Sequence, residues 1–330
     1  MDKCTLSITI PTYNRNELLK ETLNSILPQA DECKNTKIII CDNASEDNTC
    51  EIITDLMKSA PFLKYFCNST NLGYDGNILS CLKKTEGEYT FFLADDDIVP
   101  PGTIRAVIHN LQKYKPAVVC LSHYGFAGKN YIVKRKVFYP AIDKVYRDGL
   151  EFFKFAGLGF LSGLIIKTEY AHKYLHKMRD GKGCGHLDVA ARVVLKEKGP
   201  FIFLGTRPVA ARMPADFDTQ GYDLLRFGFI YVNQLYRDLV DEGCLDTEYV
   251  KAREKKLLRT LIPKYVLNQV AIGNRGRIYQ QQHLLKTEFG KYWEYYFFVR
   301  PIFFLPRTLI SIPYKILRWF LNITRDILNN

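Results

Sequence analysis

The chain has 330 residues, of which 47% are hydrophobic and 25% are charged, a composition that can build a large core and excludes disordered, collagenous and low-complexity proteins. The net charge of +11 arises within residues 251–330, which hold 15 Lys and Arg against four Asp and Glu, whereas residues 1–250 carry 31 residues of each sign. A basic surplus confined to an aromatic-rich tail argues against nucleic acid as a partner and favours a membrane surface.

The first elements in the chain alternate between strand and helix. A short β-branched strand at Leu6–Ile10 ends at Pro11 and precedes a helix that runs to about Leu27, with Asn14 as its N-cap. Three further strands follow, separated by helices of 3–4 periodicity, at Lys37–Cys41, Leu63–Cys67 and Tyr89–Leu93. This order predicts an α/β fold with a mostly parallel, doubly wound sheet.

Polar residues directly follow each of these four strands. Because ligands of open α/β sheets bind beyond the carboxyl ends of the strands, the four segments are expected to converge on one edge. The segments are Pro11 to Asn14, Asp42 and Asn43, Asn68 to Gly73, and Asp95 to Asp97.

The second half of the chain is less regular. Strands are predicted at Ala117–Leu121, Leu164–Ile166 and Phe201–Leu204, with a helix at Leu187–Lys198. We interpret this part as an antiparallel-edged extension of the same domain, followed by a region that is helical by periodicity over residues 221–262.

The run Asp95-Asp96-Asp97 after an apolar strand is the most chemically specific feature. Three adjacent carboxylates repel one another, so either solvent or a hard divalent cation must relieve the repulsion. Mg²⁺ or Mn²⁺ bound by one or two carboxylates, with phosphate oxygens completing its shell, is the expected arrangement.

Five segments in this order resemble family 2 glycosyltransferases of the GT-A fold. They are ITIPTYNR (Ile8–Arg15), IIICDNASEDNT (Ile38–Thr49), NLGYDGN (Asn71–Asn77), GEYTFFLADDDIVPPG (Gly87–Gly102) and GHLD (Gly185–Asp188). The resemblance implies a catalytic domain over residues 1–215, with a nucleotide-sugar half at about 1–115 and an acceptor half at about 116–215. A helical region would occupy residues 216–330.

The resemblance also implies roles for individual residues. Pro11, Thr12 and Tyr13 would line the nucleotide pocket, Asp42 would accept a hydrogen bond from the base, and Asn71 would shape the adjacent loop. Asp95 would lie nearer the ribose and Asp97 nearer the metal.

The register of the acidic motif and the identity of the base stay open. Because Ala94 stands where many relatives have Asp, Asp96 is the alternative metal ligand. Asp188, at the start of a helix, is the expected catalytic base, with His186 as the alternative. Ser162 and Gly163 resemble the acceptor-side segment of the family, and Arg212 is weighed as a diphosphate contact.

The tail from Lys291 to Asn330 mixes aromatic clusters with cations and prolines. Charges and prolines interrupt every apolar run, so a membrane-spanning helix is not expected. The pattern is typical of an interfacial segment on an anionic leaflet, and the alternatives are a helical subdomain with its aromatics packed inward or an RNA-binding tail.

Together these features predict a metal-dependent, inverting glycosyltransferase that uses a nucleotide-diphosphate sugar, with UDP-sugar favoured, and a lipid-linked saccharide acceptor in bacterial polysaccharide assembly. The nine scattered cysteines and the N-terminus without an apolar signal segment favour the cytoplasm, at the inner face of the plasma membrane. The alternatives are a catalytically silent sugar-nucleotide-binding or scaffold protein, and a nucleotidyltransferase.

Overall fold

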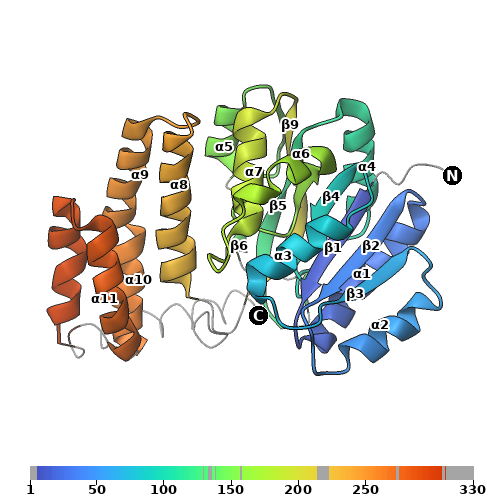
Figure 1. Cartoon of the computed structure of the whole chain (residues 1–330), viewed down its shortest axis with the longest axis horizontal. Coiled ribbons are helices and arrows are strands. Elements are labelled where there is room, and N and C mark those ends of the chain that lie inside the picture. Colours follow the sequence, from blue (N-terminus) through green and yellow to red (C-terminus); the bar gives the residue numbers. More distant parts are fainter. Residues whose placement is uncertain are drawn as a thin grey trace. The chain divides into compact units, whose positions relative to one another are not determined.

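A computed structural model describes residues 6–128, 130–132, 136–137, 139–156, 158–213, 223–272, 275–306 and 309. The chain divides into two compact units, residues 1–221 and residues 222–330, which are labelled by element in Figure 1. All the strands belong to the first unit in the part of the chain that the structure describes.

The first unit is built on one sheet, in which the described residues form nine strands. Their order is β3-β2-β1-β4-β8-β5-β9-β7, and β6 pairs with β5 (Figure 1). The strands are β1 (Leu6–Thr12), β2 (Thr36–Asp42), β3 (Leu63–Cys67), β4 (Tyr89–Phe92), β5 (Val118–Phe126), β6 (Lys136–Val137), β7 (Asp143–Tyr146), β8 (Leu164–Lys167) and β9 (Phe201–Arg212).

The first four strands are mutually parallel, as the alternation of elements predicted. The second half extends the same sheet and ends in an antiparallel edge strand, β7, as expected. In addition, antiparallel β8 lies inside the sheet between β4 and β5. Its residues Leu164, Ile165 and Ile166 are at most 1% exposed, and an unbroken apolar run of this kind suits a strand that is covered on both faces.

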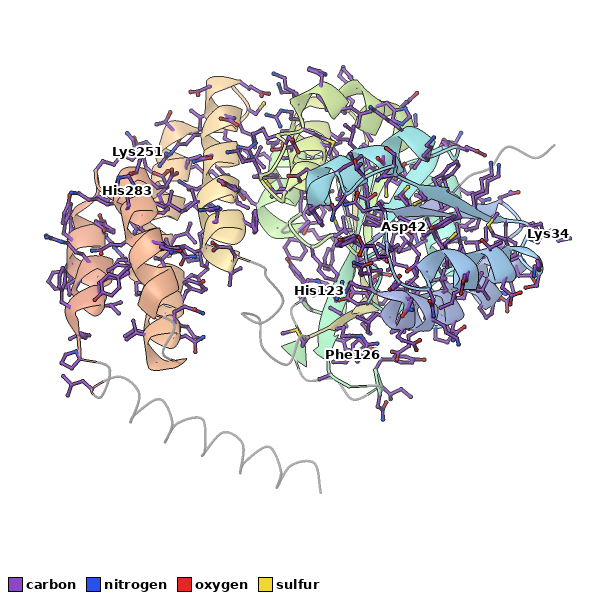
Figure 2. All side chains as sticks on the ribbon, turned by 60° about the horizontal axis from the view of Figure 1, so that its bottom comes forward. Lys34, Asp42, His123, Phe126, Lys251 and His283 are labelled. Carbon is purple, nitrogen blue, oxygen red and sulfur yellow. The ribbon has the colours of Figure 1, made fainter. Side chains whose placement is uncertain are left out.

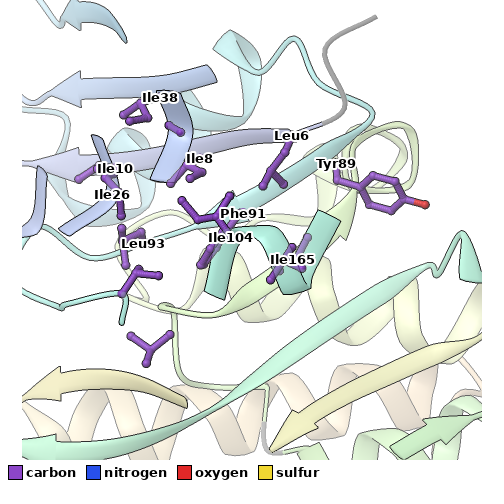
Figure 3. Close-up of a cluster of buried hydrophobic side chains, with 14 of the residues drawn as sticks. Leu6, Ile8, Ile10, Ile26, Ile38, Tyr89, Phe91, Leu93, Ile104 and Ile165 are labelled. Carbon is purple, nitrogen blue, oxygen red and sulfur yellow. The ribbon is translucent and has the colours of Figure 1, made fainter. Parts of the chain in front are cut away.

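Helices cover the sheet of the first unit. They are α1 (Asn16–Glu32), α2 (Thr49–Met57), α3 (Gly73–Lys84), α4 (Thr103–Tyr114), α5 (Gly149–Ala156), α6 (Thr168–Lys173), a 3₁₀ turn (Leu175–Lys177) and α7 (Gly185–Lys196). Alternate residues of the strands meet different helices, since successive side chains of a strand point to opposite faces. Ile38 belongs to the core cluster of Figure 3, which includes Ile26 of α1 and Ile104 of α4, whereas Ile39 packs with Cys81 of α3.

The start and end of α1 differ from the prediction. Arg15, not Asn14, occupies the N-cap position, because Asn14 adopts a φ of 51° and its side chain accepts a hydrogen bond from Glu46 N at 2.7 Å. The helix continues through Pro28 to Glu32. Proline removes one backbone hydrogen bond, but Gln29 beyond it is buried and donates to Val99 O at 3.0 Å, so tertiary contacts outweigh that loss.

The second unit is helical throughout its described residues. Its elements are a π-helical turn (Leu225–Tyr231), α8 (Val232–Asp241), α9 (Thr247–Arg259), α10 (Leu261–Ile272), α11 (Arg275–Phe289), a second π-helical turn (Tyr295–Val299) and a 3₁₀ turn (Arg300–Phe304). None of the helices that the structure describes has the length and apolarity needed to cross a bilayer. Of the predicted interfacial segment 291–330, residues 307, 308 and 310–330 lie outside the described residues.

Candidate functional site

The carboxyl ends of β1 to β4 meet at one edge of the sheet. The loop after β2 is joined to β1 by Asn43 N, which donates to Thr12 O at 2.9 Å, and Asn68 N after β3 donates to Asp42 O at 2.8 Å. The polar segments that follow the four strands are therefore neighbours, as the parallel order predicted.

Asp95 and Asp96 are bridged by a cation from the loop after β1. Arg15 Nη1 lies 2.7 Å from Asp95 Oδ1, and Arg15 Nη2 lies 2.7 Å from Asp96 Oδ2. Thr12 Oγ1 donates to Asp95 Oδ2 at 2.8 Å. Burial and the neighbouring Asp96 raise the pKa of Asp95 to about 6, while Arg15 and Thr12 oppose that rise. The guanidinium thus relieves the repulsion between two adjacent carboxylates.

Asp97 points into the protein. It is 4% exposed, and its carboxylate accepts hydrogen bonds from Ser162 Oγ and from Arg212 N, the latter at 2.8 Å. Burial and the charge of Asp96 raise its pKa. We call the run Asp95 to Asp97 the acidic turn. Asp97 anchors it, whereas the side chain of Asp96 is 20% exposed and is more accessible than that of Asp97.

Arg212 is held by protein groups, although the sequence suggested it as a diphosphate contact. Its Nε donates to Asp96 O at 3.0 Å, its Nη1 donates to Gly128 O at 2.6 Å, and its Nη2 pairs with Glu21. These contacts fix the backbone that carries the acidic residues.

On the predicted nucleotide side, Asp42, which is labelled in Figure 2, is only 1% exposed. Its Oδ1 accepts hydrogen bonds from Ser45 N, at 3.0 Å, and from Ser45 Oγ, while its Oδ2 accepts from the Tyr65 hydroxyl. A nucleotide base would have to share or replace one of these donors. Tyr13, in contrast, is 40% exposed, and Pro11 is half-buried, so both retain accessible surface.

Asn71 belongs to a network of amide side chains near the carboxyl edge of the sheet. Its Oδ1 accepts from Asn43 Nδ2 and from Gly73 N, both at 2.8 Å. Asn68 Nδ2 donates to Asn43 Oδ1 and to Asn77 Oδ1, both at 3.1 Å. Gly73 has a φ of +72°, which a residue without Cβ adopts readily. The network fixes the turn into α3.

Asp188, the predicted base, is completely buried. Arg179 contacts its carboxylate three times, through the backbone N at 3.0 Å, Nε at 3.1 Å and Nη2 at 2.8 Å, and Arg192 Nη1 lies 3.9 Å away. Burial raises the pKa of Asp188, and Arg179 opposes that rise. Asp188 and Arg179 therefore form an ion pair that closes the loop before α7. The catalytic role of Asp188 remains a prediction.

His186, the alternative base, lies in the first turn of α7 and is 5% exposed. Its Nε2 lies 3.2 Å from Gly159 O, and because a carbonyl only accepts, Nε2 must carry the hydrogen. Burial lowers the pKa of the ring and favours its neutral form. In that form Nδ1 is a hydrogen-bond acceptor, and it lies 3.3 Å from the hydroxyl oxygen of Tyr74.

Asp75 brings this part of α7 to the edge. Its carboxylate accepts hydrogen bonds from Gly183 N at 2.6 Å and from Gly185 N at 2.8 Å. A Cβ at Gly185 would lie 3.1 Å from Asp75 Oδ1 and 2.6 Å from Met178 Cε, at the flexible end of that side chain, so a larger residue would crowd the contact with Asp75. The first turn of α3 therefore holds the start of α7, together with His186.

Sequence reasoning missed several side chains that contact the predicted site residues, namely Arg15, Tyr65, Tyr74, Asp75 and Arg179. Arg15, Tyr74 and Asp75 lie inside the segments that carry the family resemblance, so their place in those segments was a usable signal. Tyr65 and Arg179 carried no comparable signal, because Tyr65 pairs with Asp42 on another strand and Arg179 lies in an irregular loop.

The residues present fit a divalent cation in an open site. No cluster of three or more His, Cys, Asp or Glu side chains with metal-binding geometry occurs in the described part of the chain. Asp95 and Asp96 nevertheless present oxygens to a single cationic group, the guanidinium of Arg15. Carboxylate oxygens are the ligands that Mg²⁺ and Mn²⁺ prefer, with substrate phosphates completing the shell.

Comparison with known proteins supports the same interpretation. Residues 7–166 match the family model described as "Glycosyl transferase family 2". These residues form a family 2 glycosyltransferase domain. The expected resemblance is thereby confirmed for this part of the chain.

Two curated relatives match this chain over limited regions. The "GalNAc(5)-diNAcBac-PP-undecaprenol beta-1,3-glucosyltransferase" of Campylobacter jejuni is 35% identical over 104 residues, covering 31% of this chain and 33% of the relative. "Abequosyltransferase RfbV" of Salmonella typhimurium is 35% identical over 116 residues, covering 35% of each chain. The matched region thus spans about a third of these relatives.

Solved structures confirm the GT-A fold. The S. aureus TarS structure (residues 1–349) in complex with UDP-GlcNAc superposes with a TM-score of 0.59 at 17% identity, covering 78% of this chain and 72% of TarS. The mannosyltransferase PcManGT of Pyrobaculum calidifontis, in complex with GDP-Man and Mn²⁺, has a TM-score of 0.53 at 16% identity, covering 72% of this chain and 64% of that chain. At these identities the likeness concerns architecture alone.

Proposed function

We propose that this protein is a metal-dependent glycosyltransferase that transfers a sugar, with inversion, from a nucleotide-diphosphate donor to a lipid-linked saccharide in bacterial glycan assembly. A UDP-sugar is the favoured donor. The observation that carries the proposal is the meeting of Thr12, Arg15, Asp95 and Asp96 at the carboxyl edge of the sheet, within a family 2 domain.

The donor nucleotide binds across the ends of β1, β2 and β3. The exposed ring of Tyr13 offers a stacking surface for the base. Asp42 can accept a hydrogen bond from a base N–H once the hydrogen bond from Ser45 or Tyr65 is broken. Asn71 holds the adjoining turn through Asn43 and Gly73.

Asp96, with Asp95, would hold Mg²⁺ or Mn²⁺, and the enclosed position of Asp97 supports this choice over Asp97 as ligand. A cation bound there would supply Lewis-acid stabilisation of the negative charge on the departing diphosphate. Arg15 either withdraws from the two carboxylates or turns toward the diphosphate, where a guanidinium can form two parallel hydrogen bonds to phosphate oxygens.

His186 is the better-supported base. An acceptor hydroxyl attacks the anomeric carbon, the bond from that carbon to the diphosphate oxygen breaks, and the hydroxyl proton passes to Nδ1 of His186, directly or through the Tyr74 hydroxyl. The neutral ring and the Nδ1 lone pair support this role. Asp188, the first choice from the sequence, then serves to position α7 through Arg179.

The lipid-linked acceptor rests on the name of the Campylobacter relative, which specifies an undecaprenol-linked substrate. A position at the inner face of the plasma membrane accords with such an acceptor.

The test is release of nucleoside diphosphate from a panel of sugar nucleotides, with and without Mn²⁺ or Mg²⁺. We expect release to require the cation, to stop on chelation and to return when the cation is restored. Asp96→Asn should lower the rate by about 100-fold or more, as loss of one electrostatic stabiliser does in other enzymes. The matched control is Asp31→Asn, an exposed carboxylate in α1.

Unchanged release in Asp96→Asn would refute the assigned metal residues. Tight donor binding without release or transfer would instead support a silent sugar-nucleotide-binding protein, and formation of pyrophosphate from a nucleoside triphosphate would support a nucleotidyltransferase.

A further inference from the structure

Among the described residues from 251 onward, the acidic side chains of the helical unit lie in its interior. Glu254, Glu288 and Glu294 are 1%, 8% and 0% exposed. Arg237 pairs with Glu254 at 2.7 Å and with Glu288 at 2.9 Å, while Arg259 pairs with Glu294 at 2.8 Å. These carboxylates are therefore hidden from any external partner.

The cations of the same segment lie outside. Within the described side chains of residues 251–306 there is no exposed carboxylate. The exposed cations are Lys251 (labelled in Figure 2), Lys255, Lys256, Arg259, Lys264, Lys286, Lys291 and Arg300. Folding thus sorts the charges of residues 251–306 by sign, so the outer surface of this segment is more uniformly positive than its composition alone implies.

A strip of large aromatic side chains is exposed after α11, just before and on the two turns that follow it. We define the aromatic strip as Trp293, Tyr296, Phe297 and Phe304, which are 59%, 43%, 68% and 68% exposed. The rings of Trp293 and Phe297 are 6.0 Å apart.

Cations lie among these rings. The guanidinium of Arg300 lies 5.8 Å from the centroid of Tyr296 and 5.9 Å from that of Phe304, and Arg259 lies 5.7 Å from Trp293. On the opposite side of the turns, Tyr295 and Val299 are at most 1% exposed. The turns are therefore amphipathic, with a buried side that fixes them and an exposed side that combines aromatic rings with positive charge.

We propose that the aromatic strip docks the protein on an anionic bilayer surface. Aromatic rings occupy the headgroup region, where their apolar bodies leave water, and cations at the same level contact anionic lipids. A second copy of this chain is a poorer occupant, because a symmetric contact would bring Arg259 and Arg300 of each copy against those of the other. The positive surface selects a negatively charged partner, and the aromatic strip selects one with an apolar layer beneath the charge.

The experiment is sedimentation of the full chain with vesicles of phosphatidylcholine alone and vesicles that also contain phosphatidylglycerol. We expect binding to the anionic vesicles only, and release by high salt. Trp293→Ala combined with Phe297→Ala should weaken binding by about tenfold or more, from the transfer of aromatic surface out of water. Arg300→Glu should weaken it by at least about fivefold, the effect of removing one cation near an anionic surface.

The matched controls are substitutions in the other unit at exposed positions. Ile142→Ala removes a side chain that is 50% exposed, and Lys20→Glu reverses an exposed cation; neither should change binding. Because all the substituted side chains are exposed, thermal unfolding should stay near that of the unsubstituted chain.

Tryptophan fluorescence tests whether the aromatic strip is the part of the protein that contacts the vesicle. The sequence has two tryptophans, so Trp319→Phe leaves Trp293 as the single probe. We expect its emission to shift to shorter wavelength, and its quenching by acrylamide to fall, when anionic vesicles are added. Vesicle binding with no change at Trp293 would assign docking to residues 307–330 and overturn the proposal. Concentration-dependent dimers that Phe297→Ala abolishes, without vesicle binding, would assign the strip to a second copy. None of these readouts requires sugar transfer, so they are independent of the proposed reaction.

Discussion

The substitutions Asp188→Asn and His186→Gln test whether Asp188 forms a structural ion pair while His186 acts as the catalytic base. Asp188 is completely buried and accepts three hydrogen bonds from Arg179. In Asp188→Asn the amide group carries no charge and turns a donor toward the guanidinium. Breaking a buried pair by removing one partner costs about 3–5 kcal/mol. For a unit of this size the melting temperature should fall by about 10 °C.

His186→Gln should behave in the opposite way. Its amide can donate to Gly159 O and accept from Tyr74, so the contacts of the ring are preserved, but it cannot take up a proton. We expect little change in melting temperature and a fall in kcat of about 10²–10⁴-fold, the usual contribution of a general base. The donor KM should stay within a few-fold of that of the unsubstituted chain.

Two measurements on both variants test these expectations. They are thermal unfolding followed by circular dichroism, and initial transfer rates at a temperature where all variants are folded. An Asp188→Asn protein with unchanged melting temperature and a collapsed rate, beside an active His186→Gln protein, would refute this reasoning. That result would restore Asp188 as the base.

Three further predictions concern the supporting structure. Asp75→Ala leaves the N–H groups of Gly183 and Gly185 without their acceptor, which should cost about 1–3 kcal/mol per group in urea unfolding, with Asp75→Asn recovering part of the loss. Burial lowers the pKa of His186 below the value of about 6.5 in an unfolded chain, so acid favours unfolding. Stability should therefore fall as pH drops below about 6.5, by at most about 1.4 kcal/mol per pH unit, with a flatter pH profile in His186→Gln; equal profiles would contradict the assignment. Gly163→Ala should destabilise the protein by about 2 kcal/mol or more, because φ is +95° and the new Cβ would lie 2.8 Å from Leu121 Cβ; an unchanged melting temperature would show that the backbone relaxes.

The first half of the fold could be predicted because its signals are local. Each strand from β1 to β4 is a short apolar run that ends in a polar turn, and the helices between them have regular periodicity. The position of β8 could not be predicted in this way. Its pairing with both β4 and β5 depends on which edges remain open after folding, and the run Leu164–Ile166 is compatible with any buried strand.

Of the candidate site, the positions of residues were predictable but their partners were not. The strand ends identified Thr12, Asp42 and the acidic run. The orientation of each carboxylate in that run depends on groups elsewhere in the chain: Arg15 draws Asp95 and Asp96 together, whereas Ser162 turns Asp97 inward. No local pattern reports such contacts, and the accessibility of Asp96 relative to Asp97 therefore emerged only from the folded structure.

The site on the acidic turn also has a kinetic consequence. Its contacts join residues that are remote in sequence, since Thr12 and Asp95 are 83 residues apart, Ser162 and Asp97 are 65 apart, and Arg212 and Asp97 are 115 apart. Contacts of such long range require closure of large loops, so they form after local helices and hairpins. The acidic turn should consequently be among the last parts to acquire its native arrangement, and during refolding the ability to bind donor should lag behind the recovery of helical circular dichroism.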